Sequence, residues 1–185
     1  LKMTEGELAA VDRIYLIACG TSYHVGLIAR TLIQTWAKVP VICDYASEFN
    51  YEQDVLVTDH TLCVVITQSG ETADTLAAIE LARKQGAFVF GICNSVGASI
   101  PRATHTGAYI HVGPEIGVAS TKAFTGQVTV LAMLTLALAK ARGTISQDEY
   151  VKMVRELVAI PEKMKEALQA NEQICLLYTS PSPRD

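Results

Sequence analysis

Short apolar runs alternate along this chain with segments in which apolar residues recur every three to four positions. The apolar runs are expected to be strands at residues 13–19, 39–45, 61–66, 87–93 and 107–112, the last of them the weakest. Unbroken β-branched and apolar runs are typical of strands that are buried on both faces of a parallel sheet. The intervening segments have helical spacing, as shown by the stripe of Val25, Ile28 and Leu32.

This alternation predicts βαβ units with right-handed crossovers and a mainly parallel sheet covered by helices on both faces. The expected fold class is therefore α/β, a doubly wound sheet. Thr4 and Glu7 have capping-box spacing, which predicts a short opening helix. The uncharged stretch from Ala123 to Ala139 is slightly short for a membrane span and contains Gln127, so we expect a buried helix there.

The segment Thr67 to Ala73 lies where the central apolar run stops and an amphipathic helix starts. A helix N-terminus offers unpaired N–H groups and partial positive charge, so an anion fits there. Gly70 allows close backbone approach, and no Gly-Lys-Ser/Thr of a nucleotide-binding Walker loop follows. Four side chains can add neutral hydrogen bonds: Thr67, Gln68, Ser69 and Thr72.

The segment Gly20-Thr21-Ser22 repeats this design after the first expected strand. In doubly wound sheets, ligands bind beyond the carboxyl ends of the strands, near the point where the strand order reverses. Two hydroxyl-rich turns at that edge favour a phosphate site for a small molecule. The alternative is that these Ser, Thr and Gly residues merely cap helices and turn the chain.

Size and charge narrow the possible functions. With 185 residues, 50% hydrophobic content and a mean hydropathy of +0.26, the chain can form one well-supplied core plus an appendage. The net charge of −4 and the absence of a basic run argue against a nucleic-acid surface. Five cysteines without a CxxC pair, and four histidines without HExxH spacing, indicate no metal site and a reducing, cytoplasmic location.

The expected domain organisation has three parts. Residues 1–143 form the main domain, residues 144–175 a helical connector, and residues 176–185 a disordered or foreign tail containing Ser-Pro-Ser-Pro. Ser146 and Glu149 have capping-box spacing and open the connector. Pro161 is expected to break or bend this helix, which continues to about Ala170.

Four ordered motifs carry a resemblance to a known family. They are Cys19-Gly20-Thr21-Ser22-Tyr23, Ala46-Ser47-Glu48-Phe49, Gln68-Ser69-Gly70-Glu71-Thr72-Ala73-Asp74-Thr75 and Glu115-Ile116-Gly117-Val118-Ala119-Ser120-Thr121-Lys122-Ala123-Phe124-Thr125. Over about residues 1–170 the chain resembles the first sugar isomerase (SIS) domain of the glucosamine-6-phosphate synthase family, the isomerizing glutamine:fructose-6-phosphate aminotransferases. This implies a three-layer αβα sandwich with a five-stranded parallel sheet, which is flavodoxin-like, and a sugar-phosphate-binding role for residues 1–143.

The resemblance also implies the roles of individual residues. The sugar phosphate would be held by Thr21, Ser22, Thr67, Gln68, Ser69 and Thr72. Val118 and Ser120 match a segment that lines the sugar. Thr67 stands where a serine is usual, which keeps the hydroxyl, whereas Asn50 and Glu52 replace residues that are often basic.

The function implied is the synthesis of glucosamine 6-phosphate from fructose 6-phosphate and glutamine, without metal or organic cofactor, by an enzyme that is a homodimer at full length. The family's glutaminase domain and second SIS domain are missing from this chain, so we expect a fragment that binds but does not catalyse. Two alternatives stay open: a sugar-phosphate-sensing SIS domain of a transcriptional regulator, and a stand-alone sugar-phosphate isomerase.

Overall fold

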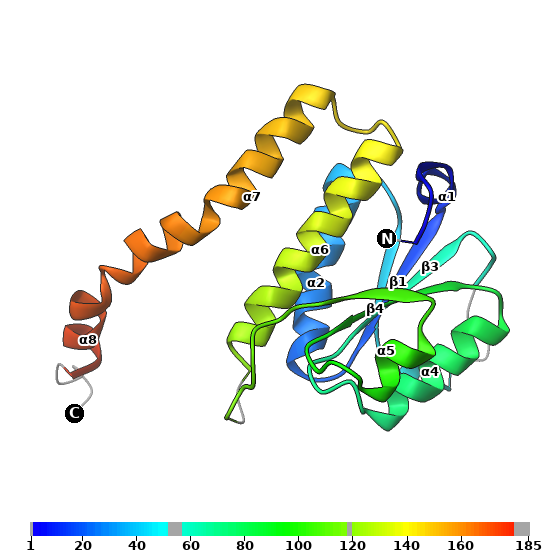
Figure 1. The fold of residues 1–185 in the computed structure, drawn as a ribbon, viewed down its shortest axis with the longest axis horizontal. Helices are drawn as coiled ribbons and strands as arrows, with labels where there is room; N and C mark the ends of the chain where they lie inside the picture. Colours follow the sequence, from blue (N-terminus) through cyan, green and yellow to red (C-terminus); the bar gives the residue numbers. More distant parts are fainter. Residues whose placement is uncertain (1, 52–56, 118–119, 180–185) are drawn as a thin grey trace. The chain divides into compact units, whose positions relative to one another are not determined.

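Five parallel strands form one sheet in the order β2-β1-β3-β4-β5 (Figure 1). The strands are β1 (Arg13–Ala18), β2 (Val41–Tyr45), β3 (Thr61–Ile66), β4 (Phe88–Cys93) and β5 (Thr106–Tyr109). This is the flavodoxin-like order, in which the chain direction across the sheet reverses between β1 and β3. The α/β class and the five-stranded parallel sheet expected from the sequence are confirmed.

The computed structural model describes residues 2–51, 57–117 and 120–179. The chain divides into two compact units, Leu1–Ile145 and Ser146–Asp185. The first unit contains the sheet and six helices: α1 (Glu5–Ala10), α2 (Thr21–Trp36), α3 (Ala46–Phe49), α4 (Ala73–Lys84), α5 (Ser99–Ala103) and α6 (Lys122–Ala141). The second unit contains α7 (Gln147–Leu168) and α8 (Asn171–Thr179).

Alternate residues of each strand point to opposite faces of the sheet and build two apolar cores. On one face Leu16 and Val64 pack with residues of α2 and α6, such as Ile33. On the other face Ile17 packs with α3, α4 and α5, for example against Ile79. Figure 1 shows α2 and α6 on one side of the strands and α4 and α5 on the other, which gives the three-layer αβα arrangement.

The long apolar helix α6 belongs to the protein core. Leu131, Leu138 and Gln127 are buried, and the helix packs along α2. By length and composition, α6 is the one helix among the described residues that could cross a membrane. Its buried residues in a core shared with the sheet agree instead with the buried helix expected from the sequence.

The limits of β1, β2 and β4 differ from the sequence expectations by one or two residues, and three other features differ more. β5 covers Thr106–Tyr109 and not 107–112, because His111 adopts a φ of 50° that extended strands do not use. α7 continues through Pro161, so of the break or bend expected there, the break does not occur. The irregular tail was expected from Leu176, whereas α8 remains helical to Thr179 and residues 180–185 lie outside the described part.

Candidate functional site

Two strand-to-helix turns meet at the carboxyl ends of β1 and β3, the strands between which the order reverses. Ligands of flavodoxin-like sheets bind at this switch point. Gly20 joins β1 directly to α2, and the turn at residues 67–72 joins β3 to α4. Between them lies a cavity of about 190 Å³. Because pockets for drug-sized ligands measure roughly 300–1,000 Å³, this cavity suits a small polar group.

The cavity brings together most of the residues that the sequence suggested for a site. Thr21, Ser22, Thr67, Gln68, Ser69, Thr72 and Ser120 line it. Val118, the remaining candidate, lies outside the described residues. Cys19, Ile66 and Thr75 also line the cavity and were not among the candidates. Cys19 Sγ lies 4.0 Å from Thr75 Oγ1, so these two side chains join the end of β1 to the first turn of α4.

The two helices that begin at the cavity have no side-chain cap. Thr72 is the N-cap residue of α4, yet its side chain makes no capping hydrogen bond, and α2 begins after Gly20, which has no side chain. By contrast, α1 and α7 begin with complete capping boxes built on Thr4 and Ser146. The first N–H groups of α2 and α4 are therefore available to a ligand, and both helix dipoles favour an anion there.

The turn after β3 is held in one conformation by its neighbours. Thr67 N donates to Ile92 O and Ile100 N donates to Gly70 O, both at 2.9 Å. Gly70 has a φ of +75°, and a Cβ at this position would lie 2.5 Å from Ala98 Cβ, so glycine is required. Gly70 N also donates to Thr67 Oγ1 at 3.1 Å. Because the Thr67 hydroxyl accepts that bond, its own proton remains available for a ligand.

Gln127 is a functional candidate that the sequence reasoning did not identify. It lies on α6 with 1% of its surface exposed, and its amide contacts the hydroxyl of Ser22. Ser22 Oγ lies 3.2 Å from Gln127 Oε1 and 3.1 Å from Gln127 Nε2. The signal that the sequence offered was a polar glutamine within a helical stretch that contains no charged residue.

Glu71 is turned toward α5 and away from a role in the cavity. Its Oε1 accepts a hydrogen bond from Ser99 N at 2.8 Å, at the first residue of α5. Hydrogen bonds from Ser99 hold the pKa of Glu71 below its usual value, so this carboxylate is ionised at neutral pH. Its negative charge therefore lies at the N-terminus of α5 and accepts a hydrogen bond there.

Glu115 organises the segment that enters α6. Its Oε1 accepts from Thr121 N at 2.7 Å and from Lys122 N at 3.0 Å, and its Oε2 accepts from Ser120 Oγ at 3.0 Å. These bonds, with that from Thr121 N the strongest, lower the pKa of Glu115. The Lys122 ammonium donates to Pro114 O at 2.7 Å and does not line the cavity. Within the described residues, hydroxyls, amides and backbone groups supply the cavity's polarity without a Lys or Arg side chain.

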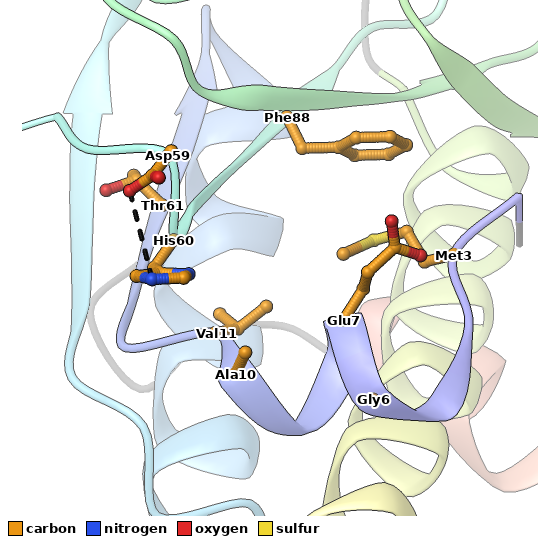
Figure 2. Close-up of a pocket in the computed structure, with 9 residues that line it drawn as sticks. All are labelled: Met3, Gly6, Glu7, Ala10, Val11, Asp59, His60, Thr61 and Phe88. Atoms are coloured by element: carbon orange, nitrogen blue, oxygen red, sulfur yellow. Dashed lines mark ion pairs between the residues drawn. The ribbon is translucent and has the colours of Figure 1, made fainter.

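A larger hollow, of about 300 Å³, lies at the opposite edge of the sheet (Figure 2). Figure 2 shows Met3 and Phe88 on one side of it and His60, with Asp59 beside it, on the other. Glu7 lines the same hollow, and its carboxylate accepts the hydrogen bonds of the α1 capping box. Two carboxylates at the amino ends of the strands disfavour an anion, so the smaller cavity at the switch point is the better candidate.

The described residues contain no cluster of three or more His, Cys, Asp or Glu side chains that could hold a metal ion. His111 contacts Tyr109, with ring centroids 5.8 Å apart, and does not line the cavity. The chemistry that this cavity offers is hydrogen bonding to an anion by neutral groups.

Comparison with known proteins places the chain in a defined context. Residues 7–137 match the SIS domain family. The chain is 58% identical over 171 residues to the isomerizing glutamine–fructose-6-phosphate aminotransferase of Bacteroides thetaiotaomicron, and 49% identical over 168 residues to that of Thermococcus kodakarensis. These matches cover 92% and 91% of this chain. In both cases the chain spans only 28% of the relative's length.

A solved structure shares the fold closely. The C-terminal domain of glucosamine-fructose-6-phosphate aminotransferase from Francisella tularensis superposes with a TM-score of 0.87 at 38% sequence identity. The match covers 92% of this chain and 48% of that one. A protein from Clostridium difficile that has been proposed to be a phosphosugar isomerase shares the fold, at 23% identity and a TM-score of 0.76.

Proposed function

The chain belongs to the SIS domain family, and we propose that its polar cavity binds the phosphate of fructose 6-phosphate. The larger protein of which it forms part would make glucosamine 6-phosphate from fructose 6-phosphate and glutamine. The names of relatives that are 58% and 49% identical support this assignment over a sensor or a stand-alone isomerase.

One observation carries the proposal: two helices without side-chain caps begin at a single hydroxyl-lined cavity. A phosphate there would accept hydrogen bonds from backbone N–H groups of both first turns and lie at the positive ends of both dipoles. Thr21, Ser22, Thr67, Gln68, Ser69 and Thr72 would add side-chain donors. These are the partners that an anion needs when no cation lines the site.

The rest of the sugar would extend from the phosphate toward Ser120 and the segment that includes Val118. Residues 1–143 would form the sugar-phosphate-binding domain and residues 144–175 a connector toward a second SIS domain. The full-length protein would be a cytoplasmic homodimer. These assignments rest on the resemblance of the motifs and on the printed functions of the relatives.

Binding without catalysis is the expected behaviour of the isolated chain. Isomerisation and amination require a positioned acid and base, and the cavity is lined by hydroxyls, one amide, one thiol and an isoleucine among the described residues. The parts of the relatives that this chain does not span would release ammonia and transfer protons. The residues that bind the phosphate would hold the substrate in place during these reactions.

Calorimetric titration of the purified chain tests the binding proposal. Fructose 6-phosphate and inorganic phosphate should both bind and compete for one site, whereas fructose should not bind detectably. Equal binding of fructose and fructose 6-phosphate, or no binding of either phosphate, would refute the proposal. Formation of glucosamine 6-phosphate by the chain alone, with glutamine or ammonia as nitrogen donor, would refute the claim that it does not catalyse.

A further inference from the structure

Gln127 is one of two polar side chains that α6 buries, and it differs from the other, Thr135, whose hydroxyl bonds to Leu131 O of the same helix. Both polar atoms of the amide lie within hydrogen-bond distance of one atom, Ser22 Oγ, at 3.1 and 3.2 Å. Ser22 is itself 8% exposed and lines the polar cavity. The pair joins the first turn of α2 to the second turn of α6, and its two residues are 105 positions apart in the sequence.

The chemistry of the two groups permits two arrangements. A serine hydroxyl has one proton and can accept as well as donate, while an amide has a donating NH₂ and an accepting C=O. In one arrangement Ser22 donates its proton to Gln127 Oε1. In the other, Gln127 Nε2 donates to Ser22 Oγ, and the Ser22 proton turns into the cavity. A fixed amide allows both arrangements without moving, because its donor and its acceptor both lie next to Ser22 Oγ.

We propose that Gln127 is a positioning residue that lets Ser22 exchange between these arrangements when an anion occupies the cavity. With the cavity empty, Ser22 donates to the Gln127 carbonyl and its proton remains satisfied. With phosphate bound, Ser22 donates to the phosphate and accepts from the Gln127 NH₂. Chains of hydrogen bonds polarise one another, so the second arrangement makes Ser22 a stronger donor. This inference rests on the proposed function, namely that the cavity binds phosphate.

Three substitutions separate this role from simple packing. Gln127→Met keeps a similar volume but can neither donate nor accept in this way. Gln127→Glu keeps the shape but, when ionised, can only accept, so it should hold the Ser22 proton and repel an anion. Ser22→Ala removes the hydroxyl on which Gln127 acts. Each variant is made in the full chain and checked for a native circular dichroism spectrum and a cooperative thermal transition.

The probe is sulfate, whose charge stays constant over the pH range used, with inorganic phosphate as a second ligand. We expect Gln127→Met to weaken sulfate binding about twofold to tenfold, since one neutral hydrogen bond is lost. Ser22→Ala should weaken it about tenfold to a hundredfold, since a bond to an anion is lost. In the Ser22→Ala background, Gln127→Met should have no further effect, because its action runs through the serine.

The Gln127→Glu variant adds a readout that a packing role would not change. A buried carboxyl has a raised pKa, so this glutamate should become neutral, and able to donate, as the pH falls. Sulfate affinity relative to wild type should therefore recover between about pH 8 and about pH 5.5. If Gln127→Met does not fold, this pH recovery still tests the inference.

The possible outcomes distinguish the inference from the proposal on which it rests. If the wild-type chain binds neither sulfate nor phosphate, the proposed function fails. If the wild type binds, but Gln127→Met weakens binding equally with and without the Ser22 hydroxyl, Gln127 acts through packing and the inference fails. A Gln127→Glu variant whose relative affinity is independent of pH would also overturn the inference.

Discussion

Thr72→Ala tests directly whether the turn after β3 is a ligand site or a helix cap. Thr72 occupies the N-cap position of α4 and has the extended backbone of a capping residue, with φ −66° and ψ 120°. Its side chain nevertheless makes no capping hydrogen bond and lines the polar cavity. The substitution should therefore affect ligand affinity more than stability.

The magnitudes follow from what Thr72 does and does not contact. Losing one hydrogen bond to an anion costs about 1.5–3 kcal/mol, which corresponds to about a tenfold to hundredfold loss of fructose 6-phosphate affinity. A capping threonine changed to alanine typically costs about 1 kcal/mol of stability. Since the Thr72 hydroxyl caps nothing, we expect its removal to change the free energy of unfolding by less than about 0.5 kcal/mol.

Thr4→Ala is the matched control. Thr4 is also an N-cap threonine, and its side chain accepts from Glu7 N in a complete capping box at the start of α1. This variant should lose about 1 kcal/mol of stability and bind fructose 6-phosphate as the wild type does. Thr72→Ala should thus lose affinity and keep its stability, whereas Thr4→Ala should lose stability and keep its affinity.

Urea unfolding in ligand-free buffer gives the stability of each variant, and calorimetric titration gives its affinity. The comparison is most complete in a protein as long as the relatives, which would contain the remaining domains. In the chain alone, the titration measures the contribution of the phosphate group to the affinity. Unchanged affinity in Thr72→Ala would show that the turn is not a phosphate site. A stability loss in Thr72→Ala as large as in Thr4→Ala would show that the hydroxyl caps α4 in solution, against the contacts observed here.

Two further substitutions test the fold, one in the turn that lines the cavity and one just before β5. Gly70→Ala should destabilise the fold by roughly 2–4 kcal/mol, measured by urea unfolding, because its Cβ would lie 2.5 Å from Ala98 Cβ and 2.7 Å from Cys93 Sγ at a φ of +75°. His105 Nδ1 accepts from Val89 N at 2.9 Å, and burial, aided by the charge of a nearby arginine, lowers the pKa of His105 below its usual value. The unfolded state therefore binds more protons below about pH 6.5, so the free energy of unfolding should fall as the pH drops through that range, and His105→Gln should reduce this slope.

The sheet could be predicted from the sequence because its strands are short apolar runs with clear limits. The boundaries of β3, Thr61–Ile66, agree with the expectation, since polar turns flank the run on both sides. β5 could not be delimited in the same way. Ile110 and Val112 continue the apolar pattern, and only the backbone shows that the chain leaves the strand conformation at His111.

Part of the candidate site was also readable from the sequence. Parallel strands end at one edge, so the hydroxyl-rich turns after β1 and β3 had to lie close together. The sequence could not show which hydroxyls make capping hydrogen bonds and which are available to a ligand. Thr4 and Thr72 both precede a helix, and only their contacts show that one caps it and the other does not. The pairing of Ser22 with Gln127 depends on the packing of α6 against α2, which no local pattern encodes.

The neutral character of the cavity limits what this part of the protein can contribute to catalysis under the proposed function. Fructose 6-phosphate and glucosamine 6-phosphate carry the same phosphate, which does not change during the reaction. The contacts to this group stabilise substrate, transition state and product about equally, so they raise affinity and can accelerate the chemical step only by orienting the substrate. Hydroxyls and helix N-termini also hold an anion less firmly than a cluster of Lys and Arg side chains would, which permits release of the product. The rate must therefore come from groups that contact the reacting carbons, and the cavity's task is to keep those carbons in reach of them.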